Sequence, residues 1–258
     1  MKFGICLLSA VPVRNQHSDR AEMVTQLIFG DLLIVQENKQ NWLNVRSVFD
    51  NYEGWVDEKQ IYLLNESEFN TLNNAPCRYS KDLVEIVQDE QGNIIPVLFG
   101  SSMRLFENDQ FSVGNKTFSF TGQLSEPNEK VMAQSVIEDA MLFLSAPYLW
   151  GGKTPFGIDC SGFIQTVYKA NGVELLRDSG QQASQGETIS LMDEALPGDL
   201  VFFDNEEAVI THVGMIIEQG KVIHASGKVR MDSIDYHGIY NKELNKYTHN
   251  LRLIKRIL

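Results

Sequence analysis

The sequence is poor in cysteine and has no long apolar run. No apolar stretch reaches the ~18 residues that a membrane-spanning helix needs, so no segment is expected to cross a membrane. Only three cysteines are present, Cys6, Cys77 and Cys160. Three thiols cannot all pair with one another, and their spacing is not that of a zinc knuckle, which favours a reducing compartment.

Basic residues are also in short supply. The chain has 22 Lys and Arg residues against 34 Asp and Glu residues, which gives a net charge of -12. This charge argues against nucleic acid and against anionic membrane surfaces as partners. It favours solubility and suits substrates that carry a positive group.

Length and composition indicate a soluble, globular chain with more than one domain, because 43% of the 258 residues are apolar and 22% are charged. Residues 1–10 faintly resemble a signal peptide. However, the apolar run is short, Pro12 and Arg14 interrupt it, and no small-residue cleavage site follows. We therefore expect a first β-strand here and a cytoplasmic location, with a secreted or periplasmic location as the alternative. The protein is expected to be a monomer.

The N-terminal half reads as short strands separated by Gly, Asn and Asp, which is typical of small all-β barrels. The expected strands include 26–31, 32–35, 42–45 and 54–57. The sequence Leu-Ile-Phe-Gly at 27–30 recurs as Val-Leu-Phe-Gly at 97–100. This weak repeat predicts two copies of one β-module, at residues 1–64 and 65–125.

A linker is expected at 124–128, and the periodicity changes after it. Residues 131–144 have apolar residues at helical spacing up to Pro147, and residues 160–170 form a second helical pattern closed by Asn171-Gly172. Strands are then expected at 200–203, 210–217 and 221–225, and residues 251–258 alternate as an edge strand would. Helices followed by a sheet predict an α+β domain at residues 126–258.

The chemistry is concentrated in Asp159-Cys160-Ser161-Gly162-Phe163 and in two later histidines. Cys160 opens the second helix of this domain, and a helix N-terminus stabilises the thiolate that attacks a substrate. His212 and His224 lie in apolar strands, where one of them would serve as the base. Taken alone, a free cysteine is more often a small buried apolar residue, and it is the Asp-Cys-Ser-Gly context, the helix start and the upstream glycines that favour a nucleophile. Cys6 and Cys77 lack a comparable context.

Five motifs occur in order: Tyr148-x-Trp-Gly-Gly, Asp159-Cys-Ser-Gly-Phe, Pro197-Gly-Asp-Leu, His212-Val-Gly and Ile223-His-Ala-Ser. Over about residues 130–258 they resemble the NlpC/P60 cysteine peptidases. The two β-modules resemble bacterial SH3 domains. The combination is similar to the γ-D-glutamyl-L-diamino acid endopeptidases, which act on muropeptides. The resemblance implies a papain-like α+β catalytic domain preceded by two small SH3-like β-barrel modules.

The resemblance implies that Cys160 is the nucleophile, His212 the general base, and His224 the polar residue that fixes the tautomer of the base. The hairpin between the two histidines provides a geometric expectation. A three-residue loop at 218–220 with Gly220 at positive φ would put both histidines on one face of the sheet, with His224 opposite Gly214.

Further residues are expected to bind substrate. Tyr148 would donate to the oxyanion beside the Cys160 N–H, and Trp150 would be pocket wall or core. Asp159 is expected to cap the helix and, with Ser161, to hold a free amino group of the substrate.

Weaker expectations concern the second half of the pocket and the first β-module. Asp178 and Ser179, in Arg177-Asp-Ser, resemble a motif that lines the pocket, with a surface salt bridge as the alternative. Glu53 and Tyr79 are expected to supply an acidic partner and a junction contact. No role is assigned to three other histidines: His17, His237 and His249.

The resemblance implies a cysteine endopeptidase that cleaves the γ-D-Glu–diamino acid bond of peptides such as L-Ala-γ-D-Glu-diaminopimelate or its Lys counterpart. A requirement for free L-Ala would suit cytoplasmic cell-wall peptide recycling. No cofactor or metal is expected. The alternatives are a wall-directed hydrolase, a non-catalytic wall-binding protein, a zinc site made of Cys160, His212 and His224, and acyl transfer on the same thiol.

Overall fold

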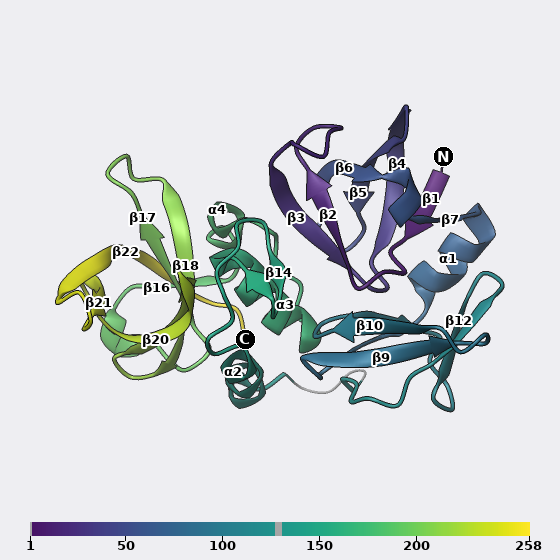
Figure 1. Ribbon diagram of the computed structural model, residues 1–258. Coiled ribbons are helices and arrows are strands. Elements are labelled where there is room, and N and C mark those ends of the chain that lie inside the picture. The colour runs from purple at the N-terminus through teal and green to yellow at the C-terminus, as the bar shows by residue number, and fades with distance from the viewer. Residues whose placement is uncertain (1, 127–130) are drawn as a thin grey trace. The chain divides into compact units, whose positions relative to one another are not determined.

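The computed structural model describes residues 2–126 and 131–258 (Figure 1). They form two compact units, each described here by itself. The first comprises residues 1–129 with Trp150–Pro155, and the second comprises residues 130–149 with Phe156–Leu258. The predicted domain boundaries stay predictions, and residues 127 and 128 of the predicted linker lie outside the described residues. No helix within the described residues is long and apolar enough to cross a membrane.

The first copy of the β-repeat is an antiparallel sheet in the order β3-β2-β6-β5-β4-β1-β7. Its apolar residues alternate with polar ones, so one side of each strand faces the interior. Its elements are β1 (Lys2–Ile5), β2 (Ala10–Arg14), β3 (Met23–Ile28), β4 (Leu32–Lys39), β5 (Trp42–Ser47), β6 (Glu53–Asp57), the 3-10 helix η1 (Glu58–Gln60) and β7 (Tyr62–Leu64).

A helix that the all-β expectation missed, α1 (Glu66–Asn74), follows the first copy. Its N-terminus is a capping box, in which the Asn65 side chain accepts from the Glu68 N–H (3.0 Å) and the Glu68 carboxylate accepts from the Asn65 N–H (2.9 Å). This pattern of Asn followed three residues later by Glu was visible in the sequence. The helix buries Phe69 and Leu72.

The second copy has two smaller sheets, in the orders β10-β9-β13-β12 and β11-β8. Its strands are β8 (Cys77–Tyr79), β9 (Val84–Asp89), β10 (Ile94–Leu98), β11 (Ser102–Arg104), β12 (Gln110–Val113) and β13 (Lys116–Ser119). The first unit also contains β14 (Lys153–Thr154).

The repeated tetrapeptide adopts the same turn in both copies. Gly30 has φ 84° and Gly100 has φ 82°, a conformation that favours glycine. The Phe before each glycine is fully buried. Hydrogen bonds repeat as well, because the Gly30 N–H donates to the Cys6 carbonyl (2.8 Å) and the Gly100 N–H to the Ser80 carbonyl (2.9 Å). The sequence repeat therefore has a structural counterpart.

The two copies share one hydrophobic core. The ring of Phe29, from the first copy, packs edge-on against Phe111 (5.9 Å between centroids) and Phe118 (5.8 Å) of the second. Phe3 stacks on Phe69 of α1 at 4.1 Å. All five aromatic residues belong to the same buried cluster, so the first unit is held together across the repeat.

The second unit has helices first and a sheet after, as predicted. Its elements are α2 (Ala133–Leu142), β15 (Gly157–Ile158), α3 (Cys160–Ala170), α4 (Ser179–Gln182), β16 (Glu187–Ile189), the 3-10 helix η2 (Met192–Glu194), β17 (Leu200–Asp204), β18 (Ile210–Glu218), β19 (Lys221–Ser226), β20 (Lys228–Asp235), β21 (Gly238–Asn241) and β22 (Lys246–Arg256).

Helix α3 spans the predicted residues because both of its ends are specified locally. The Asp159 side chain caps it, accepting from the Gly162 N–H at 2.6 Å. Gly172 follows at φ 78° and ends it. The helix α2 is shorter than expected. It ends at Leu142, with Phe143 as its C-cap and Ser145 at φ 71°, so Pro147 does not terminate it.

The sheet order is β16-β22-β17-β18-β19-β20-β21, and β21 also pairs with β22. Six strands therefore close into a ring. The prediction of an edge strand at residues 251–258 is wrong, since β22 is longer and pairs with β16, β17 and β21. Within this ring the neighbouring strands β18, β19 and β20 hold the polar chain described below.

The β18–β19 hairpin follows the prediction in outcome but not in detail. Gly220 has φ 75°, and His224 pairs with Gly214, as expected. A Cβ on Gly214 would lie 3.1 Å from that of His224, so the glycine makes room. However, Glu218 pairs with Lys221, leaving a two-residue turn. The extra residue is absorbed by a register shift between Ile216 and Glu218, which restores the parity.

Candidate active site

Cys160 lies at the first position of α3 and is buried, with 7% of its surface exposed. The backbone N–H groups of Val213 and Ser161 hydrogen-bond to its sulfur. Because Val213 follows His212 on β18, these contacts place the thiol beside that end of the strand. The N-terminus of α3 and the strand β18 thus meet at the sulfur.

The thiol is neutral at rest. Burial, and after it the Asp159 carboxylate, raises the pKa of Cys160 to about 12, although the two N–H groups oppose this shift. Burial also holds the pKa of His212 well below its usual range. Both groups are therefore neutral, so an attack by this sulfur would require its proton to pass to a base during the reaction.

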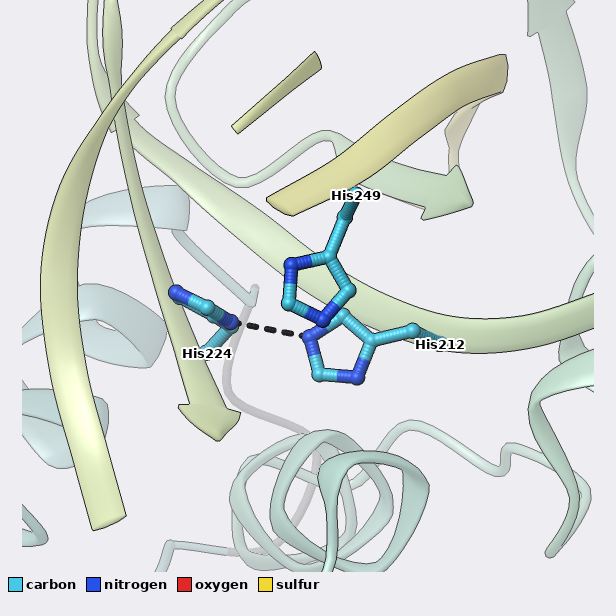
Figure 2. Close-up of side chains that lie close together, drawn as sticks. All are labelled: His212, His224 and His249. Carbon is cyan, nitrogen blue, oxygen red and sulfur yellow. Dashed lines mark hydrogen bonds between the residues drawn. The ribbon is translucent and has the colours of Figure 1, made fainter. Parts of the chain in front are cut away.

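Three side chains, beginning with His212, form a hydrogen-bonded chain across the sheet. His212 Nε2 lies 2.8 Å from His224 Nδ1 (Figure 2). His224 Nε2 lies 3.1 Å from a carboxylate oxygen of Asp232 on β20. Asp232 was not identified from the sequence. It occupies the strand position diagonal to His224, which pairs with Arg230.

The carboxylate determines the position of each proton. Asp232 only accepts, so His224 carries its proton on Nε2 and offers the Nδ1 lone pair. His212 must then donate from Nε2, which leaves its Nδ1 lone pair for the thiol proton. Asp232 is itself held by Arg230 through two hydrogen bonds of 2.6 and 3.0 Å.

His249, to which the sequence assigned no role, lies against this chain. Its ring, on β22, stacks on that of His212 with 4.3 Å between centroids and 25° between planes (Figure 2). His249 thus belongs to a cluster of three histidines with His212 and His224, whereas His17 and His237 lie outside it. The strand order that brings β22 beside β17 is a non-local property, so no local pattern could have revealed it.

A buried ion pair underlies the start of α3. Both Asp159 oxygens accept from the Arg177 guanidinium, at 3.0 and 2.7 Å, and Arg177 also donates to the Ser161 hydroxyl at 3.0 Å. Arg177 is 1% exposed, so the surface salt bridge considered for this motif is excluded for it. Asp159 caps the helix, and its charge is already balanced by an arginine.

Tyr148 lies near the nucleophile. Burial raises the pKa of its hydroxyl to about 12, and the neighbouring Cys160 and Asp159 add to the shift. The hydroxyl therefore stays protonated, and its role as a donor to an oxyanion stays a prediction. Asp178 is exposed and precedes α4, whereas Ser179 is buried within it. Their roles in substrate binding stay predictions.

The remaining predicted site residues belong to the first unit. Glu53 begins β6, is exposed, and accepts from the Gln36 side chain at 2.6 Å. Tyr79 ends β8 and is half-buried. The Trp150 indole is 61% exposed and donates to Glu22 at 2.7 Å. These residues stay predictions as substrate ligands.

Gly151 shows why a glycine follows Trp150. It has φ 74°, and a Cβ there would lie 2.4 Å from the Met23 carbonyl oxygen. The backbone at Gly151 therefore approaches the first β-copy more closely than any side chain would allow.

The comparisons with known proteins agree with this arrangement. A protein-family model described as "NlpC/P60 family" matches residues 145–250 of the chain. A second family model, described as "Bacterial dipeptidyl-peptidase Sh3 domain", matches residues 13–61. A Bacillus subtilis protein named γ-D-glutamyl-L-lysine dipeptidyl-peptidase is 32% identical over 237 residues, covering 85% of this chain and 78% of that protein. The chain belongs to the NlpC/P60 family. The predicted family and its cysteine-peptidase chemistry are confirmed.

Other NlpC/P60 relatives bear on the fold. Dipeptidyl-peptidase 6 of Lysinibacillus sphaericus is 27% identical over 252 residues, covering 87% of this chain and 89% of that protein. A crystal structure of an NlpC/P60 family protein from Bacillus cereus superposes with a TM-score of 0.84 at 22% identity, covering 99% of each chain. The predicted fold class, a papain-like NlpC/P60 domain after an SH3 domain, is confirmed. The assignment of the second β-copy as an SH3 module stays a prediction.

Proposed function

We propose that this protein is a cysteine peptidase that hydrolyses the amide between γ-D-glutamate and the following diamino acid in peptidoglycan-derived peptides. The observation that carries the proposal is the hydrogen-bonded chain behind Cys160, which runs from His212 through His224 to Asp232. It supplies a base with a defined tautomer beside a nucleophile at a helix N-terminus.

The chemistry proceeds through an acyl-enzyme. The Cys160 sulfur bonds to the carbonyl carbon as its proton passes to His212, the C–N bond then breaks, and His212 returns the proton to the leaving amine. Water attacks the resulting thioester, losing a proton to His212, and the dipeptide acid and the thiol are released. The Cys160 N–H and the Tyr148 hydroxyl are the proposed donors to the oxyanion in both steps.

The relatives support the substrate class. The proteins named dipeptidyl-peptidases match this chain over 79–87% of its length, including the β-copies. The Listeria welshimeri protein named probable endopeptidase p60 is 38% identical over 112 residues, only 43% of this chain. Similarity that includes the N-terminal region favours a dipeptide-releasing role over a general wall-directed endopeptidase.

The finer proposal is that the peptide must begin with a free L-Ala. Asp159 is bonded to Arg177, so its charge alone is a weak partner for an ammonium group. A further acid is then needed, and Glu53 of the first β-module is the proposed one. Selection of free peptides suits recycling in the cytoplasm; a secreted, wall-directed hydrolase is the alternative.

A paired assay tests the proposal. L-Ala-γ-D-Glu-L-Lys, its diaminopimelate counterpart and the N-acetylated form of each are incubated with the protein, and released dipeptide is measured by mass spectrometry. Cys160→Ala is the inactive control. Cleavage of the free peptides alone is expected. Cleavage of both forms would contradict the amine requirement, and cleavage of neither would contradict the proposed substrate.

A further inference from the structure

Three histidines from three strands of the closed ring converge beside the nucleophile. One ring nitrogen each from His212 on β18, His224 on β19 and His249 on β22 lies within 4.8 Å of the other two. Figure 2 shows the three imidazoles turned toward one another. The peptidase chemistry uses only the first two, so the third imidazole is left without a part in it.

The tautomer of His249 is determined by its neighbours. Its Nδ1 lies 2.9 Å from the Thr248 hydroxyl oxygen, and that hydroxyl donates to the Ile239 carbonyl at 3.4 Å. The hydroxyl oxygen therefore accepts the Nδ1 proton, and the Nε2 lone pair is free to point elsewhere. In Figure 2 this second nitrogen of His249 is turned toward the His212–His224 hydrogen bond.

His224 is held in a comparable way. Its Nε2 proton is directed to Asp232 at 3.1 Å, so its Nδ1 lone pair is directed into the cluster. A carboxylate behind one ligating histidine and a hydroxyl behind another are the outer contacts that orient imidazoles at metal centres. Two of the three lone pairs are thus preset by the protein, and the third lies on His212.

We propose that His212, His224 and His249 bind a divalent transition-metal ion of the Zn²⁺ type, and that this ion inhibits the peptidase. Three neutral imidazoles suit zinc and leave one tetrahedral position open. Nitrogens bound to one zinc ion are about 3.3 Å apart, given Zn–N bonds of about 2.0–2.1 Å. The His212–His224 pair is 2.8 Å apart and must separate by about 0.5 Å. The His249 nitrogen lies within 4.8 Å of the other two, so it must close in by up to about 1.5 Å, and its ring must tilt out of its stack on His212.

Inhibition follows from the proton positions rather than from steric blocking. An ion on Nε2 of His212 displaces the proton that this nitrogen donates to His224, and neutral imidazole then carries its proton on Nδ1. That is the nitrogen which must accept the Cys160 proton. The bound ion therefore removes the general base even if it never touches sulfur. This inhibitory step rests on the proposed peptidase function, whereas ion binding does not.

His249→Phe is the variant that separates ion binding from peptidase activity. A Phe ring retains the stacking surface on His212 and removes both nitrogens. His237→Phe is the matched control, since His237 is exposed on the same unit and lies outside the cluster. Cys160→Ala tests whether the thiol is a required ligand. Zn²⁺ binding to each metal-free protein is measured by calorimetry, and peptide hydrolysis is measured with and without Zn²⁺ and after a chelator.

The wild type, His237→Phe and Cys160→Ala are expected to bind one ion per chain. His249→Phe should bind it at least about 100-fold more weakly and remain active at Zn²⁺ concentrations that inhibit the wild type. Loss of binding in Cys160→Ala would overturn the proposal, because it would assign the ion to the thiol. Equal binding by His249→Phe would also overturn it, and so would full activity of the zinc-bound wild type.

A measurement on the wild type alone guards against a variant that fails to fold. In protein labelled with ¹⁵N at histidine, Zn²⁺ should shift one ring nitrogen each of His212, His224 and His249. Shifts confined to His17 and His237 would overturn the proposal. Because this measurement needs no substrate, it is informative even if the proposed peptide is not cleaved.

Discussion

Asp232→Asn tests the proton relay behind the nucleophile. The Asp232 carboxylate accepts from His224 at 3.1 Å and is also bonded to Arg230. A hydrogen bond to a charged group contributes about 1.5–3 kcal/mol, and sharing the carboxylate with an arginine favours the lower end. Since about 1.4 kcal/mol changes a rate tenfold, kcat should fall about 10- to 30-fold.

The effect should fall on kcat and not on KM. Positive charge develops on His212 only while the thiol proton is being transferred. Asp232 acts on that charge through His224, which lies between the carboxylate and the His212 ring. Steady-state release of the dipeptide measures both constants. Asp235→Asn, the same change on the same strand but bonded to Tyr247, is the control and should change kcat less than about twofold.

Two results with Asp232→Asn would contradict the proton relay. A wild-type kcat in Asp232→Asn would show that the carboxylate does not set the tautomer of His224. A change carried mainly by KM would mean that Asp232 acts on substrate binding. Folding needs checking in parallel, but Arg230 keeps its bond to Glu243 at 3.2 Å, so a loss of only about 1 kcal/mol in unfolding free energy is expected.

Four further outcomes are expected. Cys160→Ala should abolish turnover with a native circular dichroism spectrum, and retained turnover would exclude the thiol mechanism. Arg177→Leu should cost about 3–5 kcal/mol in urea unfolding because it removes the guanidinium that balances the charge of the buried Asp159 carboxylate; wild-type stability would contradict this. Glu53→Ala should raise KM for peptides with a free amine, and an equal rise for acetylated peptides would remove Glu53 from the amine site. Burial lowers the pKa of His249 to about 4, below the usual 6.5, so as pH falls the unfolded chain takes up the proton first. The metal-free protein should therefore keep its full stability above pH 6.5 and lose some of it toward pH 4, by about 1–2 kcal/mol from this partly exposed group; a flat profile would argue against its burial.

Local patterns account for what the sequence predicted well. Helix α3 begins and ends as expected because Asp159 and Gly172 specify its ends within a few residues. The two histidines predicted to be catalytic could be placed on one face because they share a hairpin, so only turn geometry and parity had to be known. Even there, the prediction put the extra residue in the loop, whereas the structure accommodates it by a register shift after Ile216.

What the sequence did not reveal depends on strands far apart in the chain. Asp232 lies on the strand after His224, and its pattern of Arg230-x-Asp232 also fits an ordinary exposed strand. His249 reaches His212 only because β22 lies beside β17 and closes on β21. Arg177 reads as a surface residue until α4 and α3 are seen to enclose it. Each of these contacts is a property of strand order or tertiary packing, which a single sequence does not specify.

The shared aromatic core of the first unit has a consequence for how that unit unfolds and evolves. Phe29 of the first copy packs edge-on against the stacked rings of Phe111 and Phe118 of the second, so removing either copy would expose aromatic surface on the other. The two β-copies should therefore unfold together in one cooperative transition, although the repeated sequence suggests two independent modules. A truncation between them is expected to aggregate, and exchange of one copy for a homologue would require matched changes in the other.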